Sequence, residues 1–140
     1  MDEQYLAYED LEPGRRFPEA PYRYAVTAEA VAQYRAVFEQ ARVDAPPAEP
    51  HPDTVPPTFA AVYFRGAKDA VCGPPGGVHA RQSFVFHRPV AIGDVIHTAL
   101  TVKERYERNG APFVAFDIDC RNQDGVPVTS GTMVQIWGRG

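Results

Sequence analysis

The segment Phe84-Val-Phe-His-Arg-Pro-Val-Ala-Ile-Gly-Asp-Val-Ile96 carries the clearest fold signal in the chain. An alternating aromatic strand ends at Arg88-Pro89, since proline cannot donate a hydrogen bond within a sheet. Gly93-Asp94 is a tight turn signal, and a second apolar strand begins immediately after it. The segment therefore predicts two strands joined by a short connection.

The remainder of the C-terminal half also predicts β-structure. Residues 78–87, 96–102 and 114–120 alternate apolar and polar side chains with the period of a strand. Asn109-Gly110 is a strong type I′ hairpin signal, and Asp124-Gly125 is a second hairpin signal that leads into the last strand. We expect four consecutive antiparallel strands from residue 78 onward.

The N-terminal half predicts a short strand over residues 22–26 and a helix over residues 28–41. Thr27 can act as the N-cap of this helix, and Glu29 lies in its first turn, where the helix dipole favours negative charge. Its apolar residues recur at helical spacing: Val31, Tyr34, Phe38 and Ala41.

A proline-rich segment separates this helix from a second one. Six of the fourteen prolines fall in residues 43–57, a density that neither a helix nor a central strand tolerates. Thr58 can cap a second helix that runs to about Cys72 and ends at Gly73-Pro74-Pro75-Gly76-Gly77. The apolar stripe of this helix is predicted to contain Phe59, Val62, Tyr63, Gly66 and Ala70.

Composition limits the class of protein. The 140 residues suffice for one domain, are 44% hydrophobic and 23% charged, and carry a net charge of −4 without a basic cluster. We expect no nucleic-acid partner. No apolar run approaches a membrane span and no signal peptide is visible, so we expect a cytoplasmic protein. The two cysteines suggest a reducing compartment, and four scattered histidines predict no metal site.

One long helix wrapped by an antiparallel sheet is an α+β arrangement, and it resembles the hot-dog fold of MaoC-like dehydratases and hydratases. The resemblance covers nearly all of residues 1–140 as one domain. It includes Glu9–Gly14, Pro57-Thr58-Phe59 and the Arg88-Pro89…Gly93-Asp94 turn. The segment Val78–Pro89 looks most like the N-terminal, FAS1-like dehydratase branch of the family.

The resemblance implies a catalytic motif, Gly-Asp-x-Asn-Pro-x-His, that this chain lacks. In the family, an Asp and a His activate water across the double bond of an enoyl thioester. This chain has Phe38–Pro46 at that place. The nearest substitutes are Asp44 and His51, seven positions apart. They are solvated loop residues, a displaced catalytic pair, or residues with another role such as contact with a partner subunit. Degenerate family members of this kind pair with a catalytic copy and supply the acyl-binding half.

Four residues are candidates for contact with substrate. Backbone amides at Thr58 and Phe59 could polarise a thioester carbonyl at the start of the central helix, although every helix has such an end. Tyr63 could line an acyl tunnel, or it could belong to the ordinary core. His79 could touch substrate or a partner, or it could be a polar residue at a strand edge.

The expected function is hydration of trans-2-enoyl thioesters or dehydration of (3R)-hydroxyacyl thioesters, with acyl-CoA or acyl-carrier-protein as substrate and no cofactor. We expect a homodimer, or a heterodimer with a catalytic hot-dog subunit, because exposed sheet edges pair across subunits. Besides a divergent enzyme that uses the same pocket for another elimination or cyclisation, two alternatives stay open. A hot-dog thioesterase needs a carboxylate near the central helix, where Asp69 lies near the wrong end. A non-enzymatic acyl-thioester-binding or assembly protein needs no carboxylate near the central helix.

Overall fold

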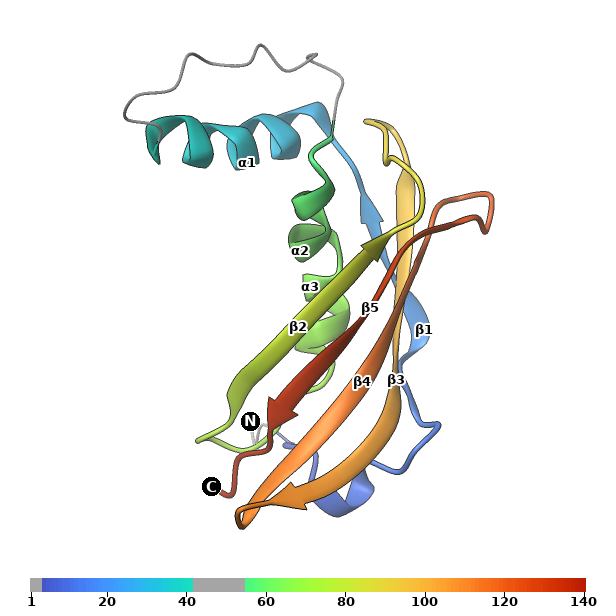
Figure 1. Ribbon diagram of the computed structural model, residues 1–140. Coiled ribbons are helices and arrows are strands. Elements are labelled where there is room, and N and C mark those ends of the chain that lie inside the picture. The colour runs from blue at the N-terminus through green and yellow to red at the C-terminus, as the bar shows by residue number, and fades with distance from the viewer. Residues whose placement is uncertain (1–3, 42–54) are drawn as a thin grey trace.

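The computed structural model describes residues 4–41 and 55–140 (Figure 1). Strands dominate the C-terminal half and helices the segment between the first two strands. No helix among these residues is long and apolar enough to cross a membrane. The elements are, in chain order, the 3-10 helix η1 (Tyr8–Asp10), β1 (Arg16–Ala25), α1 (Ala28–Ala41), the 3-10 helix η2 (Pro57–Phe59), α2 (Ala60–Tyr63), α3 (Arg65–Asp69), β2 (Val78–Phe86), β3 (Val95–Arg108), β4 (Ala111–Arg121) and β5 (Pro127–Ile136).

The strands form one antiparallel five-stranded sheet with the order β1-β3-β4-β5-β2. Strands β1 and β2 are therefore its two edges. The consecutive segments η2, α2 and α3 lie along the inner face of the curved sheet, and α1 extends away from it at one end (Figure 1). This is the predicted α+β hot-dog arrangement, and the fold prediction is confirmed.

The predicted Asn109-Gly110 turn and the predicted Thr27 cap are confirmed. Asn109 (φ 52°) and Gly110 (φ 76°) both have the positive φ angles that a type I′ turn requires. The Thr27 hydroxyl accepts a hydrogen bond from the Ala30 amide at 3.1 Å, as expected of an N-cap. At the β4–β5 turn, the Asn122 side chain accepts hydrogen bonds from the amides of Asp124 and Val126.

The central helix differs from the prediction. Thr58 makes no capping hydrogen bond, and Pro57 occupies the first turn of η2 instead. The helical segment is divided at Phe64 into α2 and α3, so it is not one continuous helix. The predicted apolar stripe is also wrong in part, since Val62 and Gly66 are only partly buried and Ala70 is exposed. The buried side chains are Phe59, Ala60, Tyr63, Phe64, Ala67 and Val71.

The first strand, β1, has 10 residues and is twice as long as the strand predicted over residues 22–26. It begins at Arg16 rather than at Tyr22, and its pairing with β3 shifts register between Phe17 and Tyr22. Pro18 and Pro21 interrupt the alternating pattern in the sequence. Prolines are tolerated there because β1 is an edge strand.

Gly66 sets how closely the central helix approaches the sheet. A β-carbon at Gly66 would overlap the ring of Tyr22, which lies on β1. We predict that Gly66→Ala lowers the free energy of unfolding by about 1–2 kcal/mol, because displacing the ring outweighs the better helix propensity of alanine. Urea denaturation would measure the change.

The matched test is the same substitution in a Tyr22→Ala background. There the ring is gone, and Gly66→Ala should be neutral or stabilising. An equal loss of stability in both backgrounds would contradict the assigned contact.

Candidate functional site

A cavity of about 350 Å³ opens between the start of the central helical segment and the end of β2. This volume lies at the lower end of the range for small-molecule sites. Most of its wall is apolar, and hydroxyl groups lie at its buried end. It is lined by Val55, Pro56, Pro57, Tyr63, Phe86, His87, Arg88, Pro89, Val90 and Thr129.

The buried end of the cavity is a pair of hydroxyl groups. The Tyr63 hydroxyl and the Thr129 hydroxyl lie 2.5 Å apart and form a hydrogen bond between α2 and β5. The two residues are only 2% and 1% exposed. Burial raises the pKa of Tyr63 to about 12, so its hydroxyl is neutral and can donate a hydrogen bond at neutral pH.

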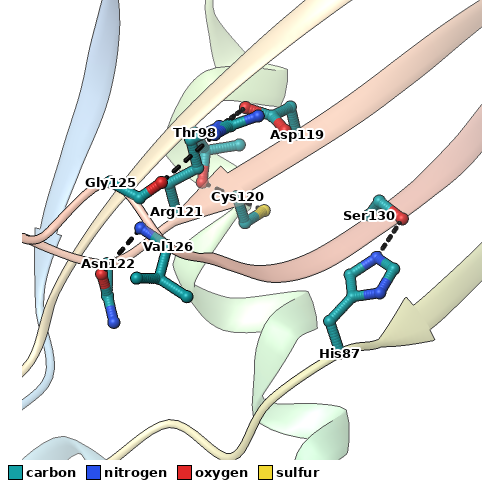
Figure 2. A network of polar contacts seen from close by, with 9 residues as sticks. All are labelled: His87, Thr98, Asp119, Cys120, Arg121, Asn122, Gly125, Val126 and Ser130. Carbon is teal, nitrogen blue, oxygen red and sulfur yellow. Dashed lines mark hydrogen bonds and ion pairs between the residues drawn. The ribbon is translucent and has the colours of Figure 1, made fainter.

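Thr129 belongs to a row of side chains that crosses the whole sheet. Thr98, Cys120 and Thr129 are register partners on β3, β4 and β5, and Phe86 of β2 continues the row to the edge. The Thr98 hydroxyl donates a hydrogen bond to the Cys120 sulfur at 3.3 Å (Figure 2). Burial also raises the pKa of the Cys120 thiol to about 12, which makes it unreactive.

The entrance to the central helix forms one wall of the cavity. Pro56 is extended, and Pro57 starts the 3-10 turn. The Phe59 amide donates a hydrogen bond to the Pro56 carbonyl at 2.9 Å, and the Phe59 ring is completely buried. The Thr58 hydroxyl, which is exposed, accepts a hydrogen bond from the Tyr34 hydroxyl at 2.7 Å.

His87 stands at the rim of the cavity. Figure 2 shows its ring at the end of β2, directed toward Ser130 on the neighbouring strand β5. Its Nε2 atom lies 2.7 Å from the Ser130 hydroxyl. His87 is exposed, and the sequence pattern did not single it out as a site residue. The contact joins residues 43 positions apart, which no local pattern reveals.

The Gly93-Asp94 turn fixes the loop that forms the opposite wall. The Asp94 carboxylate accepts hydrogen bonds from the Ala91 amide at 2.9 Å and from the Gln123 side chain at 3.0 Å. The Gly93 amide donates to the Val26 carbonyl at 2.9 Å, and the Gly93 φ angle of 99° favours glycine. The turn that identified the fold therefore also holds the residues between β2 and β3 against the cavity.

The structure brings together only some of the predicted site residues. Tyr63 lines the cavity, whereas Thr58 and Phe59 directly follow the lining residues Pro56 and Pro57 and do not line it themselves. Asp44 and His51 fall outside the described residues. His79 lies at the other end of β2, roughly 23 Å from Phe86 at the usual rise of a strand.

His79 lines a second hollow, of about 410 Å³, near the end of α3. Burial, together with the nearby positive charge of Lys68, lowers the pKa of His79. Asp69, the carboxylate weighed for a thioesterase, lines this second hollow and not the cavity at the start of the helix.

The cavity carries little charge. Arg88 lies at its rim, and no carboxylate belongs to the described residues that line it. Among the residues that the structure describes, no group of three or more His, Cys, Asp and Glu side chains could hold a metal ion. Neutral hydroxyls, one imidazole and apolar walls suit a hydrophobic ligand with a polar or anionic portion outside the cavity.

A family model described as the FAS1-like dehydratase domain region matches residues 12–130. The chain belongs to this family. A relative in Saccharopolyspora erythraea, described as a UPF0336 protein, is 30% identical over 128 residues, which cover 82% of this chain and 81% of that protein. The predicted membership in the MaoC-like hot-dog group, in its FAS1-like branch, is confirmed.

Solved structures show the same fold for this FAS1-like chain. The R-hydratase PhaJ1 from Pseudomonas aeruginosa superposes with a TM-score of 0.73 at 22% identity, covering 95% of this chain and 86% of that one. The C-terminally truncated HadBC complex from Mycobacterium tuberculosis, a 3R-hydroxyacyl-ACP dehydratase, superposes with a TM-score of 0.68 at 24% identity. The match covers 89% of this chain and 96% of that one. A MaoC-like dehydratase from Rhodospirillum rubrum superposes with a TM-score of 0.70 at 22% identity, covering 96% of this chain and 99% of that one.

The buried hydroxyl of Tyr63 predicts a pH dependence of stability. Its folded-state pKa of about 12 lies above the ordinary value of 10.0, so the unfolded chain loses the phenol proton first as the pH rises. The stabilising contribution is therefore complete below about pH 10 and is lost between about pH 10 and 12. We expect the free energy of unfolding to fall less steeply over this range in Tyr63→Phe than in the wild type, measured by urea denaturation. Equal slopes in the two proteins would contradict the assignment.

Proposed function

We propose that this chain binds the acyl group of an acyl thioester, as one subunit of a hydro-lyase. The reaction is hydration of a trans-2-enoyl thioester or dehydration of a (3R)-hydroxyacyl thioester. A second hot-dog subunit, paired across β2, supplies the Asp/His dyad. The observation that carries the proposal is an apolar cavity without a lining carboxylate among the described residues, placed beside an exposed sheet edge.

The cavity has the composition expected of an acyl site. Its walls are mainly proline, valine and phenylalanine side chains, which stabilise a hydrocarbon chain by removing it from water. Arg88 at the rim places a positive charge where the thioester carrier would leave the cavity. CoA and phosphopantetheine are both anionic, so this charge favours their approach.

The exposed edge supplies the reason for a second subunit. Val78 and Val85 of β2 are each 54% exposed, and Phe86 is 45% exposed. An exposed apolar edge strand is a template for pairing with another chain. Phe86 lines the cavity as well, so a subunit paired along β2 would reach the acyl group directly.

The chemistry requires such a contribution. Addition of water to the double bond needs one group that moves the proton of water and another that exchanges a proton at C2. The titratable side chains in the described cavity wall are Tyr63, His87 and Arg88. Tyr63 stays protonated because burial raises its pKa to about 12. A partner with an intact Asp and His would complete the site, as the HadBC dehydratase is a complex.

The direct test is an enoyl-CoA hydration assay on crotonyl-CoA and longer substrates, followed by the loss of enoyl absorbance. We expect the isolated chain to bind acyl-CoA without turnover. Turnover should appear when a hot-dog subunit with an intact Gly-Asp-x-Asn-Pro-x-His motif from the same genome is added.

Asp44→Ala and His51→Ala distinguish the alternatives. Turnover by the isolated chain that both substitutions abolish would show a displaced dyad and contradict the accessory role. Hydrolysis of acyl-CoA would indicate a thioesterase. Saturable binding without turnover in any combination would indicate a non-enzymatic acyl-binding protein.

The proposed pairing along β2 predicts the effect of a charge on that edge. Val85→Glu should convert a two-chain particle into a single chain, because a carboxylate at the paired edge would lose its water. Light scattering coupled to size-exclusion chromatography would measure the mass. Val37→Glu is the matched control, since Val37 is 66% exposed on α1, away from β2. If both variants have the same mass as the wild type, the interface lies elsewhere.

A further inference from the structure

The hydroxyl pair at the buried end of the cavity has capacity for one more hydrogen bond. Tyr63 and Thr129 each supply one hydroxyl hydrogen, and their mutual hydrogen bond uses one of the two. Neither side chain makes another polar contact with the described residues. Among the described residues, one hydroxyl hydrogen and several lone pairs of this pair therefore have no partner.

The position of this pair decides which groups can reach it. Both residues line the cavity and are almost completely withdrawn from bulk water. On the sheet side, Cys120 is already the acceptor of the Thr98 hydrogen bond. A ligand that fills the cavity and displaces solvent must therefore replace the third hydrogen bond itself, or lose the affinity that an unsatisfied buried hydroxyl costs.

A second tyrosine–threonine pair, which joins α1 to η2, provides the contrast. Tyr34 donates a hydrogen bond to Thr58 at 2.7 Å, but Thr58 is exposed. Water can form the remaining hydrogen bonds of the Tyr34–Thr58 pair whether or not the cavity is filled. Once an acyl chain occupies the cavity, water can no longer form a hydrogen bond with the Tyr63–Thr129 pair.

We propose that Tyr63 and Thr129 select acyl thioesters whose acyl chain carries a hydroxyl or carbonyl oxygen beyond C3, by hydrogen bonding to that oxygen at the buried end of the cavity. The inference rests on the proposed acyl-binding function and specifies its substrate class. Polar groups built to hydrogen-bond a substrate oxygen discriminate strongly against an analogue that lacks it. A saturated chain of equal length should therefore bind less tightly.

The test is calorimetric titration of the full chain with hexanoyl-CoA and with its 4-, 5- and 6-hydroxy derivatives. We expect at least one hydroxylated ligand to bind about tenfold more tightly than hexanoyl-CoA, the effect of one satisfied buried hydrogen bond. Tyr63→Phe and Thr129→Val should reduce this preference to about twofold or less, because each removes one hydroxyl of the pair and with it most of the free-energy difference between the ligands. Thr129→Ser keeps the hydroxyl and should retain the preference.

Tyr8→Phe is the matched control for loss of a tyrosine hydroxyl. The Tyr8 hydroxyl donates to the Tyr106 carbonyl at 3.3 Å and does not line the cavity, so this variant should keep the preference of the wild type. Equal affinity of the wild type for all four ligands, or a preference that survives in Tyr63→Phe, would overturn the inference and leave acyl binding intact. Failure of all four ligands to bind the wild type would instead overturn the proposed function.

Discussion

The architecture depends on the close approach of a short helical segment to the inner face of one sheet. Small residues permit the approach: Ala60 and Ala67 are completely buried, and the Tyr22 ring lies over Gly66. Two aromatic anchors hold the ends. Near the start of the helical segment, the Tyr63 hydroxyl forms a hydrogen bond with the Thr129 hydroxyl. After the end of the segment, the Trp137 ring packs over Gly73, and its indole N–H donates a hydrogen bond to the Leu6 carbonyl at 2.8 Å. With the helix fixed in this way, the edge strand β2 stays only partly covered, and an opening is left between its end and the entrance of the helix.

That opening explains why the cavity, the exposed edge and the diagnostic turn are found together. The Asp94 carboxylate holds the β2–β3 loop through the Ala91 amide and Gln123, so the loop residues form a firm wall. Phe86 belongs both to the wall and to the exposed edge. Acyl binding and subunit pairing would therefore use the same strand. In the proposed arrangement, this chain would bind the acyl group and a second chain would carry out the acid–base chemistry.

Local signals in the sequence predicted most of the fold. The bounds of α1, the Thr27 cap and the Asn109-Gly110 turn follow from short-range chemistry, and all three are present. The break in the central helix was missed because packing against the sheet overrides local propensity there. The extension of β1 past Pro18 was missed because only the strand order shows that β1 is an edge strand, where proline is tolerated. The site was less predictable. Tyr63 and Thr129 are 66 positions apart, and only the register of the sheet brings them into contact.

The central claim is that the acyl chain occupies the cavity between the start of the central helix and the end of β2. Photo-crosslinking with an acyl-CoA that carries a diazirine at the end of its acyl chain, followed by peptide mass spectrometry, tests this claim directly. The account predicts modification within residues 55–63, within residues 86–90 or at Thr129, suppressed by excess unlabelled acyl-CoA. Competable labelling around Gly73–His79, in the second hollow at the opposite end of β2, would contradict it.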